Sequence, residues 1–253
     1  MLNKRIIPTL LLKNTGLVKT INFKRPTYIG DPINAVKIFN EKEVDEVIFL
    51  DITKTKEKKE PNFNLIKEIA NECFIPFAYG GGLNSVDSIR KILKLGAEKV
   101  IINTAAFYTP NLISEAASIF GSQSIVVSID YKKIWSGKKN VFVEAGKKNT
   151  KIDPVSYALR MEELGAGELY INSIDHEGKR CGYDIETIGA IASKVKIPVI
   201  ASGGANDLDD IKNLLKKTQI SAASAGSIFV FYGDMNGVLI NYPNREKIAS
   251  ILK

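Results

Sequence analysis

Short apolar runs alternate with amphipathic segments along the whole chain. The apolar runs predict eight strands, over residues 5–12, 46–52, 75–79, 99–103, 124–130, 167–173, 197–201 and 220–225. Most of them are apolar throughout, as is typical of parallel strands that helices cover. Helical patterns lie between them, such as SVDSIRKILKLG, where we expect Ser85 as the N-cap and Gly96 as the C′ residue.

The chain also contains an internal repeat. IPFAYGGGLNSVDSIRKILKLGAEKVIINTAAF, from Ile75, matches IPVIASGGANDLDDIKNLLKKTQISAASAGSIF, from Ile197, at an offset of 122 residues. DEVIFLDIT, from Asp45, matches GELYINSID, from Gly167, at the same offset. Four strands in each half predict a single α/β domain over residues 1–253, a (β/α)8 TIM barrel with half-barrels of approximately 1–122 and 123–253. A doubly wound open sheet is the alternative, but a two-fold repeat favours closure into a ring.

Composition fits a cytoplasmic globular protein, because no apolar run approaches the roughly 18 residues of a membrane helix. Cys73 and Cys181 are isolated, as in reduced proteins. The single histidine, His176, excludes a multi-histidine zinc site, and DHEGKR around it predicts that it is exposed. We expect no metal and no cofactor.

The net charge of +7 suits anionic small substrates. The densest basic stretch, YKKIWSGKKNVFVEAGKKNT, alternates with strand-like residues. A nucleic-acid site would need a basic face with stacking aromatic residues. This stretch is therefore interpreted as a solvated hairpin, and no nucleic-acid partner is expected.

Glycine-rich turns follow the third and seventh predicted strands, as GGG (80–82) and SGG (202–204). Glycine lets backbone N–H groups approach an anion closely. NT (103–104) and GS (226–227) follow the fourth and eighth strands and add hydroxyl groups and amides. Loops after strands 7 and 8 of a barrel often bind phosphate, and the repeat predicts a second such cradle across the mouth. A ligand with two phosphates, or with two separated anionic groups, would fit.

A family resemblance rests on KRIIP, GDP, FLDIT, GGGLNSVDSIRKILKLGAEKVIINTAAF, GSQSIVVSID, GAGELYINSIDHEGKRCGYD and IPVIASGGA. Over nearly the whole chain these segments resemble the cyclase subunit of imidazole glycerol phosphate synthase. That subunit is a histidine-biosynthesis barrel that a glutaminase partner supplies with ammonia. The resemblance implies phosphate-binding residues at Gly82, Asn103, Thr104, Gly203, Gly204, Gly226 and Ser227.

The resemblance also implies three residues with catalytic roles, namely Asp130, Lys19 and Asp51, and a substrate loop with Asp175 and Glu177. It places a ring of charges at the N-terminal face of the barrel, as a gate for ammonia: Arg5, Glu46, Lys99 and Glu168. A stabilising salt-bridge ring without transport is the alternative. Lys4, Glu98 and Gln123 are expected on the same face at the glutaminase interface, or else as ordinary solvated residues.

One position departs from the cyclase pattern. The family ends its first strand with an aspartate that works opposite the acid at Asp130, and this chain has Leu11 there. Ring closure by general acid–base catalysis needs two such groups, and leucine transfers no proton. The usual Arg-Asp-Gly-Thr after the sixth strand is also replaced, by residues 176–179, His-Glu-Gly-Lys.

These changes more closely resemble a divergent branch associated with surface-polysaccharide biosynthesis, in which an N-acetyl group on a sugar becomes an N-acetamidino group. That branch implies two partners, a glutaminase and an ATP-dependent sugar amidotransferase, and a phosphorylated small-molecule or sugar substrate. A histidine-pathway cyclase and a non-catalytic scaffold that activates a glutaminase are the alternatives. We expect the segment 14–31, with Lys19 and Tyr28, to be a mobile loop over the site.

Overall fold

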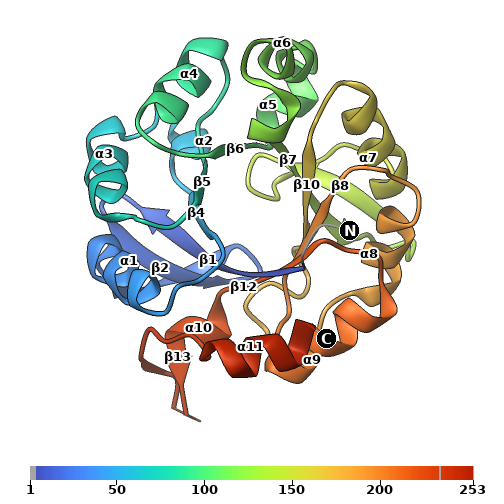
Figure 1. Ribbon diagram of the computed structural model, residues 1–253. Coiled ribbons are helices and arrows are strands. Elements are labelled where there is room, and N and C mark those ends of the chain that lie inside the picture. The colour runs from blue at the N-terminus through green and yellow to red at the C-terminus, as the bar shows by residue number, and fades with distance from the viewer. Residues whose placement is uncertain (1–3, 234, 253) are drawn as a thin grey trace.

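Eight parallel strands form a closed barrel in the computed structural model, which describes residues 4–233 and 235–252. Each strand pairs with the next along the chain, and the last pairs with the first, Arg5 opposite Ala222, which closes the ring (Figure 1). The strands are β1 (Arg5–Lys13), β4 (Val47–Asp51), β5 (Phe77–Gly80), β6 (Lys99–Ile102), β7 (Ile125–Lys133), β10 (Glu168–Ser173), β11 (Val199–Ser202) and β12 (Ala222–Ala225). The predicted (β/α)8 barrel is confirmed, and the open sheet is wrong.

Helices surround the barrel on its outside (Figure 1). The longer ones are α1 (Pro32–Glu41), α3 (Phe63–Glu72), α4 (Val86–Lys94), α6 (Asn111–Phe120), α7 (Pro154–Glu163), α8 (Ile185–Ala192), α9 (Leu208–Lys217) and α11 (Arg245–Leu252). Helix α4 begins as its sequence predicts. The Ser88 N–H donates to Ser85 Oγ over 3.2 Å, and the Ser85 N–H donates back to Ser88 Oγ. Gly96, at φ +113°, follows the last residues of the helix and allows the chain to turn away.

Two apolar clusters fill the molecule. The larger lies between the strands and the helices. The smaller lies inside the barrel and takes one residue from each of the eight strands: Ile7, Ile48, Ala78, Ile101, Val126, Tyr170, Ile200 and Ala222. The barrel interior is therefore packed with side chains beneath its mouth.

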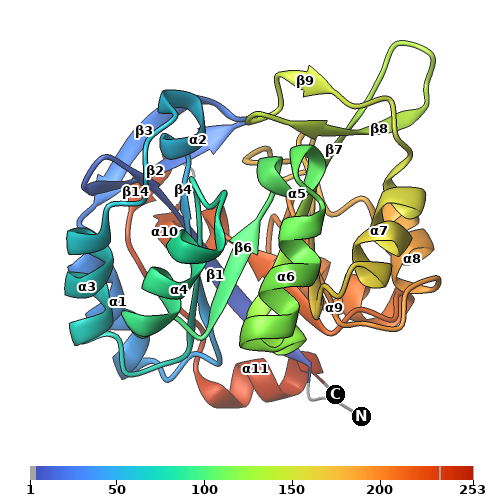
Figure 2. The same cartoon turned by 90° about the horizontal axis from the view of Figure 1, so that it is seen from above.

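Two hairpins rise from the carboxyl ends of the strands. The first consists of β2 (Gly16–Ile21) and β3 (Lys24–Gly30), so the predicted loop over 14–31 is a β-hairpin in this structure. The second consists of β7 and β8 (Lys139–Val143) and confirms the predicted hairpin; β9 (Lys148–Asn149) extends it. Figure 2 shows both on one side of the barrel, opposite α11. A Cβ on Gly146 would lie only 3.1 Å from Phe23 Cδ2, so the hairpin ends touch.

Shorter elements complete the chain: α2 (Lys54–Glu57), α5 (Thr104–Tyr108), a 3-10 turn (Ser122–Ser124), α10 (Ser227–Val230), β13 (Phe231–Tyr232) and β14 (Gly237–Val238). Within the described residues, no helix combines the length and apolar content that crossing a bilayer requires. Cys73 and Cys181 are both free thiols.

Candidate active site at the carboxyl ends of the strands

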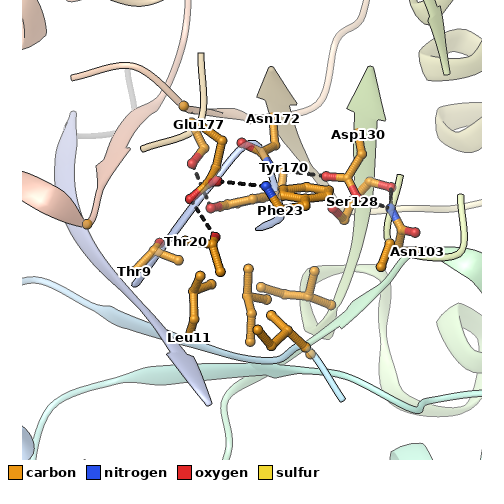
Figure 3. A pocket seen from close by; sticks show the side chains of 18 of the residues that line it. Thr9, Leu11, Thr20, Phe23, Asn103, Ser128, Asp130, Tyr170, Asn172 and Glu177 are labelled. Atoms are coloured by element: carbon orange, nitrogen blue, oxygen red, sulfur yellow. Dashed lines mark hydrogen bonds between the residues drawn. The ribbon is translucent and has the colours of Figure 1, made fainter. Parts of the chain in front are cut away.

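A cavity of about 170 Å³ opens at the carboxyl ends of the barrel strands, beneath the two hairpins. Its walls contain most of the residues that the sequence nominates: Lys19, Asp51, Gly82, Asn103, Thr104, Asp130, Glu177, Gly203, Gly204, Gly226 and Ser227. These residues come from opposite ends of the chain, and only barrel closure brings them together. Figure 3 shows the polar side chains that converge on this cavity.

Asp130 lies near the end of β7 and is only 8% exposed. Asn172 Nδ2 donates to its Oδ1 over 3.1 Å, and Asn103 Nδ2 donates to its Oδ2 over 3.2 Å. Burial raises the pKa of Asp130 to about 7, although the two amide hydrogen bonds act against this shift and the nearby Glu177 adds to it. A carboxyl group with a pKa near neutrality can both accept and donate a proton under physiological conditions.

Leu11 occupies the equivalent position on β1. Barrel register pairs Leu11 with Leu50, just as it pairs Asp130 with Asn172. Figure 3 shows Leu11 across the cavity from Asp130, with Thr20 beside it. The acid and its amide partner on β7 and β10 are therefore replaced by two leucines on β1 and β4.

Glu177, in the loop after β10, fastens the first hairpin over the cavity. Its Oε1 accepts from Lys19 Nζ over 3.1 Å and from Thr20 Oγ1 over 3.0 Å. Its Oε2 accepts from the backbone N–H of Phe23, at the hairpin tip, over 3.1 Å. Since both oxygens are occupied and the residue is buried, Glu177 holds the hairpin closed in this structure.

The second glycine cradle follows β11 and β12. Gly203 and Gly204 have φ values of +89° and +111°, and a Cβ on Gly204 would lie 2.0 Å from Gly182 O. A Cβ on Gly226 would lie 2.9 Å from Lys19 Cε, so the lysine side chain packs directly on this cradle. Ser227 is buried beside it. Backbone amides and an ammonium group thus face the same part of the cavity, as a bound phosphate requires.

The first cradle lies across the mouth, after β5 and β6. Gly82 has φ +71°, and a Cβ there would lie 2.8 Å from Lys54 Cβ. Thr104 Oγ1 accepts from the backbone N–H of Glu144 over 3.0 Å, which ties this cradle to the second hairpin. Asn103 contributes to both the cradle and the Asp130 environment. The two cradles face each other with Asp130 between them along the strand order.

Two acids of the predicted site, Asp51 and Asp175, accept hydrogen bonds from neighbouring residues of the protein. Asp51 Oδ1 accepts from the Thr53 N–H over 2.9 Å and from Thr53 Oγ1 over 2.6 Å, which stabilises the turn after β4. Asp175 Oδ2 accepts from the Lys133 N–H over 2.8 Å, outside the main cavity. The structure therefore places Asp51 in the cavity wall but does not bring Asp175 into it.

Four charged side chains form a ring at the opposite end of the barrel. Arg5 pairs with Glu46 and with Glu168. Lys99 Nζ lies 3.1 Å from Glu46 Oε2 and 2.8 Å from Glu168 Oε2. Burial raises the pKa of Glu46, against the influence of Lys99 and Arg5. Two positive and two negative groups neutralise one another here.

Lys4, Glu98 and Gln123 flank this ring at the strand starts, as the sequence predicts. Lys4 Nζ donates to Leu215 O over 2.7 Å, whereas Glu98 and Gln123 are exposed. All three lie on the face opposite the cavity.

The prediction of an exposed His176 is wrong. His176 is half-buried, and its Nδ1 lies 2.7 Å from Gly182 O, beside the second cradle. Across residues 4–233 and 235–252, no three His, Cys, Asp or Glu side chains are grouped to hold a metal ion.

Three residues of the cavity were not found from the sequence. Asn172 binds Asp130, and its own Oδ1 is buried without a hydrogen-bond partner among the described residues. Arg180 lines the second cradle, with Nη2 3.5 Å from Ser227 O. Phe23, at the tip of the first hairpin, also lines the cavity. Of these three residues, only Asn172 could have been found from the sequence, because aligning the predicted strands places it beside Asp130.

Comparison with known proteins agrees with this geometry. The family model described as histidine biosynthesis protein matches residues 5–236. The hisF2 protein of Pseudomonas aeruginosa, provisionally named as an imidazole glycerol phosphate synthase subunit, is 50% identical over 98% of this chain and 99% of its own length. The provisionally named hisF3 of Vibrio vulnificus is 44% identical over 100% and 98%.

A third relative, imidazole glycerol phosphate synthase subunit HisF of Streptococcus mutans, is 41% identical over 93% of this chain and 94% of its own length. Both the family model and these full-length relatives agree with the closed barrel and its mouth. The chain therefore belongs to the histidine biosynthesis protein family and is a homologue of the HisF subunits of imidazole glycerol phosphate synthase.

Proposed function

We propose that the protein is the ammonia-accepting synthase subunit of a glutamine-dependent amidotransferase system, and that its reaction uses one barrel carboxylate rather than two. The single observation that carries the proposal is Asp130 opposite Leu11. Glu177 and Asp51 also line the cavity, but their carboxylates are bound by Lys19, Thr20 and Thr53. Asp130 is held only by amide groups, and burial raises its pKa to about 7.

Ammonia enters, in this proposal, through the ring of Arg5, Glu46, Lys99 and Glu168. A glutaminase subunit docks on that face, near the exposed Glu98 and Gln123. Beyond the ring lies the apolar cluster inside the barrel. Neutral ammonia crosses such a layer at little cost, whereas ammonium and other ions pay a large desolvation penalty. The buried, unpartnered Asn172 Oδ1 offers an acceptor for an ammonia N–H at the inner end of the route.

The acceptor is an N-acetyl group on a sugar destined for a surface polysaccharide, and the product is an N-acetamidino group. Ammonia nitrogen bonds to the acetamido carbon, whose oxygen an ATP-dependent sugar amidotransferase has phosphorylated or adenylylated. The bond between that carbon and its oxygen then breaks, and the oxygen leaves as part of inorganic phosphate or AMP. Asp130 takes the proton that the attacking nitrogen loses. A second acid is unnecessary, because the activated oxygen is already a good leaving group. Leu11 keeps water from that side of the carbon.

Lys19 and the glycine cradles bind the anionic groups of the ligand. Lys19 Nζ lies between Glu177 and Gly226, so a phosphate bound in the second cradle would form an ion pair with the Lys19 ammonium group. Retention of these groups disfavours a purely non-catalytic scaffold, which would have no use for a buried Asp130.

The second candidate is the histidine-pathway cyclase, and the names of the relatives favour it. Two opposed phosphate cradles suit its bisphosphate substrate. Because Leu11 replaces the expected acid, either Asp130 would serve both proton transfers or Glu177, which lines the same cavity, would supply the second. That role requires Glu177 to release Lys19 and the hairpin first.

Direct assay with the cyclase substrate separates the candidates. The purified protein is given ammonium at alkaline pH, which bypasses the glutaminase, together with the histidine-pathway bisphosphate. We expect no imidazole product from the wild type, and gain of product in Leu11→Asp. Turnover by the wild type at a rate comparable to a HisF subunit would establish the cyclase instead.

Amidine formation is then measured in a system reconstituted with the glutaminase and the sugar amidotransferase. Asp130→Asn should reduce the rate roughly 100-fold or more, with folding unchanged. Wild-type activity in that variant would remove the proposed role of Asp130. Thr55→Ala is the matched control, since Thr55 lines the same cavity from α2 but belongs to neither glycine cradle.

A further inference from the structure

A second cavity, of about 340 Å³, lies beside the first, where the tip of the first hairpin meets the turn between β8 and β9. Its polar wall consists mainly of five lysines, and each comes from a different segment of the chain: Lys24 from β3, Lys56 from α2, Lys132 from β7, Lys147 from the turn before β9, and Lys179 from the loop after β10. We call this group the outer lysine pocket. Only folding collects these charges, because they span more than half of the sequence.

The outer lysine pocket lacks neutralising acids. Asp175 is the one carboxylate in its wall, and its Oδ2 accepts from the Lys133 backbone N–H. None of the five lysines forms an ion pair with another described residue. Nearby lysines behave differently: Lys19 pairs with Glu177, and Lys139 pairs with Asp184. Lys132 Nζ lies over the Phe142 ring, 6.0 Å from its centroid, but none of the five exposed lysines is paired with a carboxylate of a described residue.

Convergence of like charges is unfavourable unless a counter-ion occupies the space between them. Lysine ammonium groups are strongly hydrated point charges that commonly bind phosphate oxygens. A single phosphate would leave most of this charge unmatched, whereas a diphosphate brings about three negative charges. The remaining wall is uncharged, formed by Asn22, Phe23, Ala145, Gly146 and Ile174, and suits the organic part of a small ligand.

We propose that the outer lysine pocket binds the diphosphate group of a small molecule, at a site additional to the two glycine cradles. The inference stands independently of the acceptor chemistry described above. It identifies a nucleoside diphosphate group as the ligand class, which a nucleotide-linked sugar and a free nucleotide such as ATP both carry. Because Phe23, Lys56 and Ala145 line both cavities, occupancy of this pocket also holds the tip of the first hairpin against the turn between β8 and β9.

The test is a titration of the ¹⁵N-labelled full chain with inorganic pyrophosphate, followed by amide NMR. Amides of Ala145, Gly146 and Lys147 report the outer lysine pocket, while those of Gly204 and Gly226 report the inner cradle. We expect saturable shifts at the outer reporters. Lys132→Gln/Lys147→Gln should weaken that binding tenfold or more and leave the inner shifts in place.

Lys133→Gln/Lys148→Gln is the matched control, because it removes the same charge from adjacent positions that do not line the pocket. Equal weakening by both double variants, or shifts confined to the inner reporters, would overturn the proposal. Lys179→Gln tests the pocket from another segment if the double variant fails to fold, since Lys179 lines this pocket and does not line the first cavity. Titrations with a uridine-diphosphate sugar, ATP and AMP then identify which ligand the pocket prefers. Tighter binding of the uridine-diphosphate sugar indicates a nucleotide-linked sugar, and tighter binding of ATP indicates a free nucleotide. AMP, which has a single phosphate, should bind weakest.

Discussion

Asn172 donates a hydrogen bond of 3.1 Å to Asp130, and the equivalent neighbours in the other half of the barrel are Leu50 and Leu11. The same backbone register thus supports a polar pair on one side of the mouth and an apolar pair on the other. This difference between the two halves can be tested by substitutions at Asn172 and Asp130.

Asn172→Leu places next to Asp130 the residue type that Leu50 provides next to Leu11. The Asn172 hydrogen bond lowers the pKa of Asp130, so its loss should move that pKa above its value of about 7. A ¹³C NMR titration of the carboxyl group, assigned with Asp130→Asn, measures the shift. Thr55→Ala, which changes a cavity residue of α2, should leave the titration unchanged, and an unaltered Asp130 pKa in Asn172→Leu would contradict the assigned role.

Asp130→Asn should stabilise the protein increasingly as pH rises. The folded state retains a proton on Asp130 up to about pH 7, whereas an unfolded aspartate releases it near pH 4. The wild type therefore loses stability through this group across that interval, and the amide variant does not. At about 1.4 kcal/mol per pKa unit over the two pH units from 5 to 7, the variant should gain roughly 2.5 kcal/mol relative to wild type between pH 5 and pH 8.

Urea unfolding at the two pH values gives this comparison. Asp209→Asn, which changes an exposed acid of α9, is its control. A stability difference between Asp130→Asn and wild type that stays constant with pH would mean that Asp130 titrates normally.

Glu177→Gln should release the first hairpin. The substitution removes the charge that holds Lys19 and weakens acceptance from Thr20 and the Phe23 N–H. Amide hydrogen exchange of peptides covering residues 16–30 should become roughly tenfold faster or more, because local opening costs less free energy. Asp175→Asn, in the same loop but bound to Lys133, should leave these peptides unchanged.

Glu46→Gln should destabilise the barrel by about 2 kcal/mol, measured by urea unfolding. It leaves Arg5 and Lys99 sharing the single carboxylate of Glu168 in a largely buried ring. Glu98→Gln, an exposed acid on the same face, serves as the comparison and should change stability little. Equal effects of the two substitutions would show that the ring is not electrostatically coupled.

Phe74→Ala should weaken binding of the glutaminase roughly tenfold or more. Phe74 precedes β5 on the face of the charged ring and is 83% exposed, which is unusual for a large aromatic residue away from an interface. Calorimetric titration with the glutaminase subunit measures the effect. Trp135→Ala removes a fully exposed aromatic from the opposite end of the barrel and should not matter.

The barrel itself was predictable from the sequence because each strand is a short apolar run, and the repeat places four of them in each half. The first hairpin was not predictable. Residues of β3 are mostly exposed, and the tip residues Asn22 and Phe23 adopt φ values of +51° and +63° without a glycine to signal the turn. Its closure depends on Glu177, more than 150 residues away, a contact that no local pattern reveals.

Within the site, acids and glycines were recognisable because their chemistry is rare at strand ends. Asn172 was overlooked, since asparagine there suggests a turn as readily as a partner for an acid. The engagement of Asp51 by Thr53 was likewise hidden, because it depends on side-chain direction rather than on order in the chain. The outer lysine pocket is invisible in sequence, where its five members look like ordinary solvated residues.

The near-equivalence of the two glycine cradles has a consequence for ligand orientation. An elongated ligand with an anionic group at each end can seat in the barrel in either of two directions, related by the pseudo-two-fold axis. Only one direction brings the reacting carbon to Asp130, and the other presents it to Leu11. Under the proposed function the reversed arrangement is an unproductive competitor. Asp130 and Leu11, together with Lys19 at the second cradle alone, then distinguish one end of the ligand from the other.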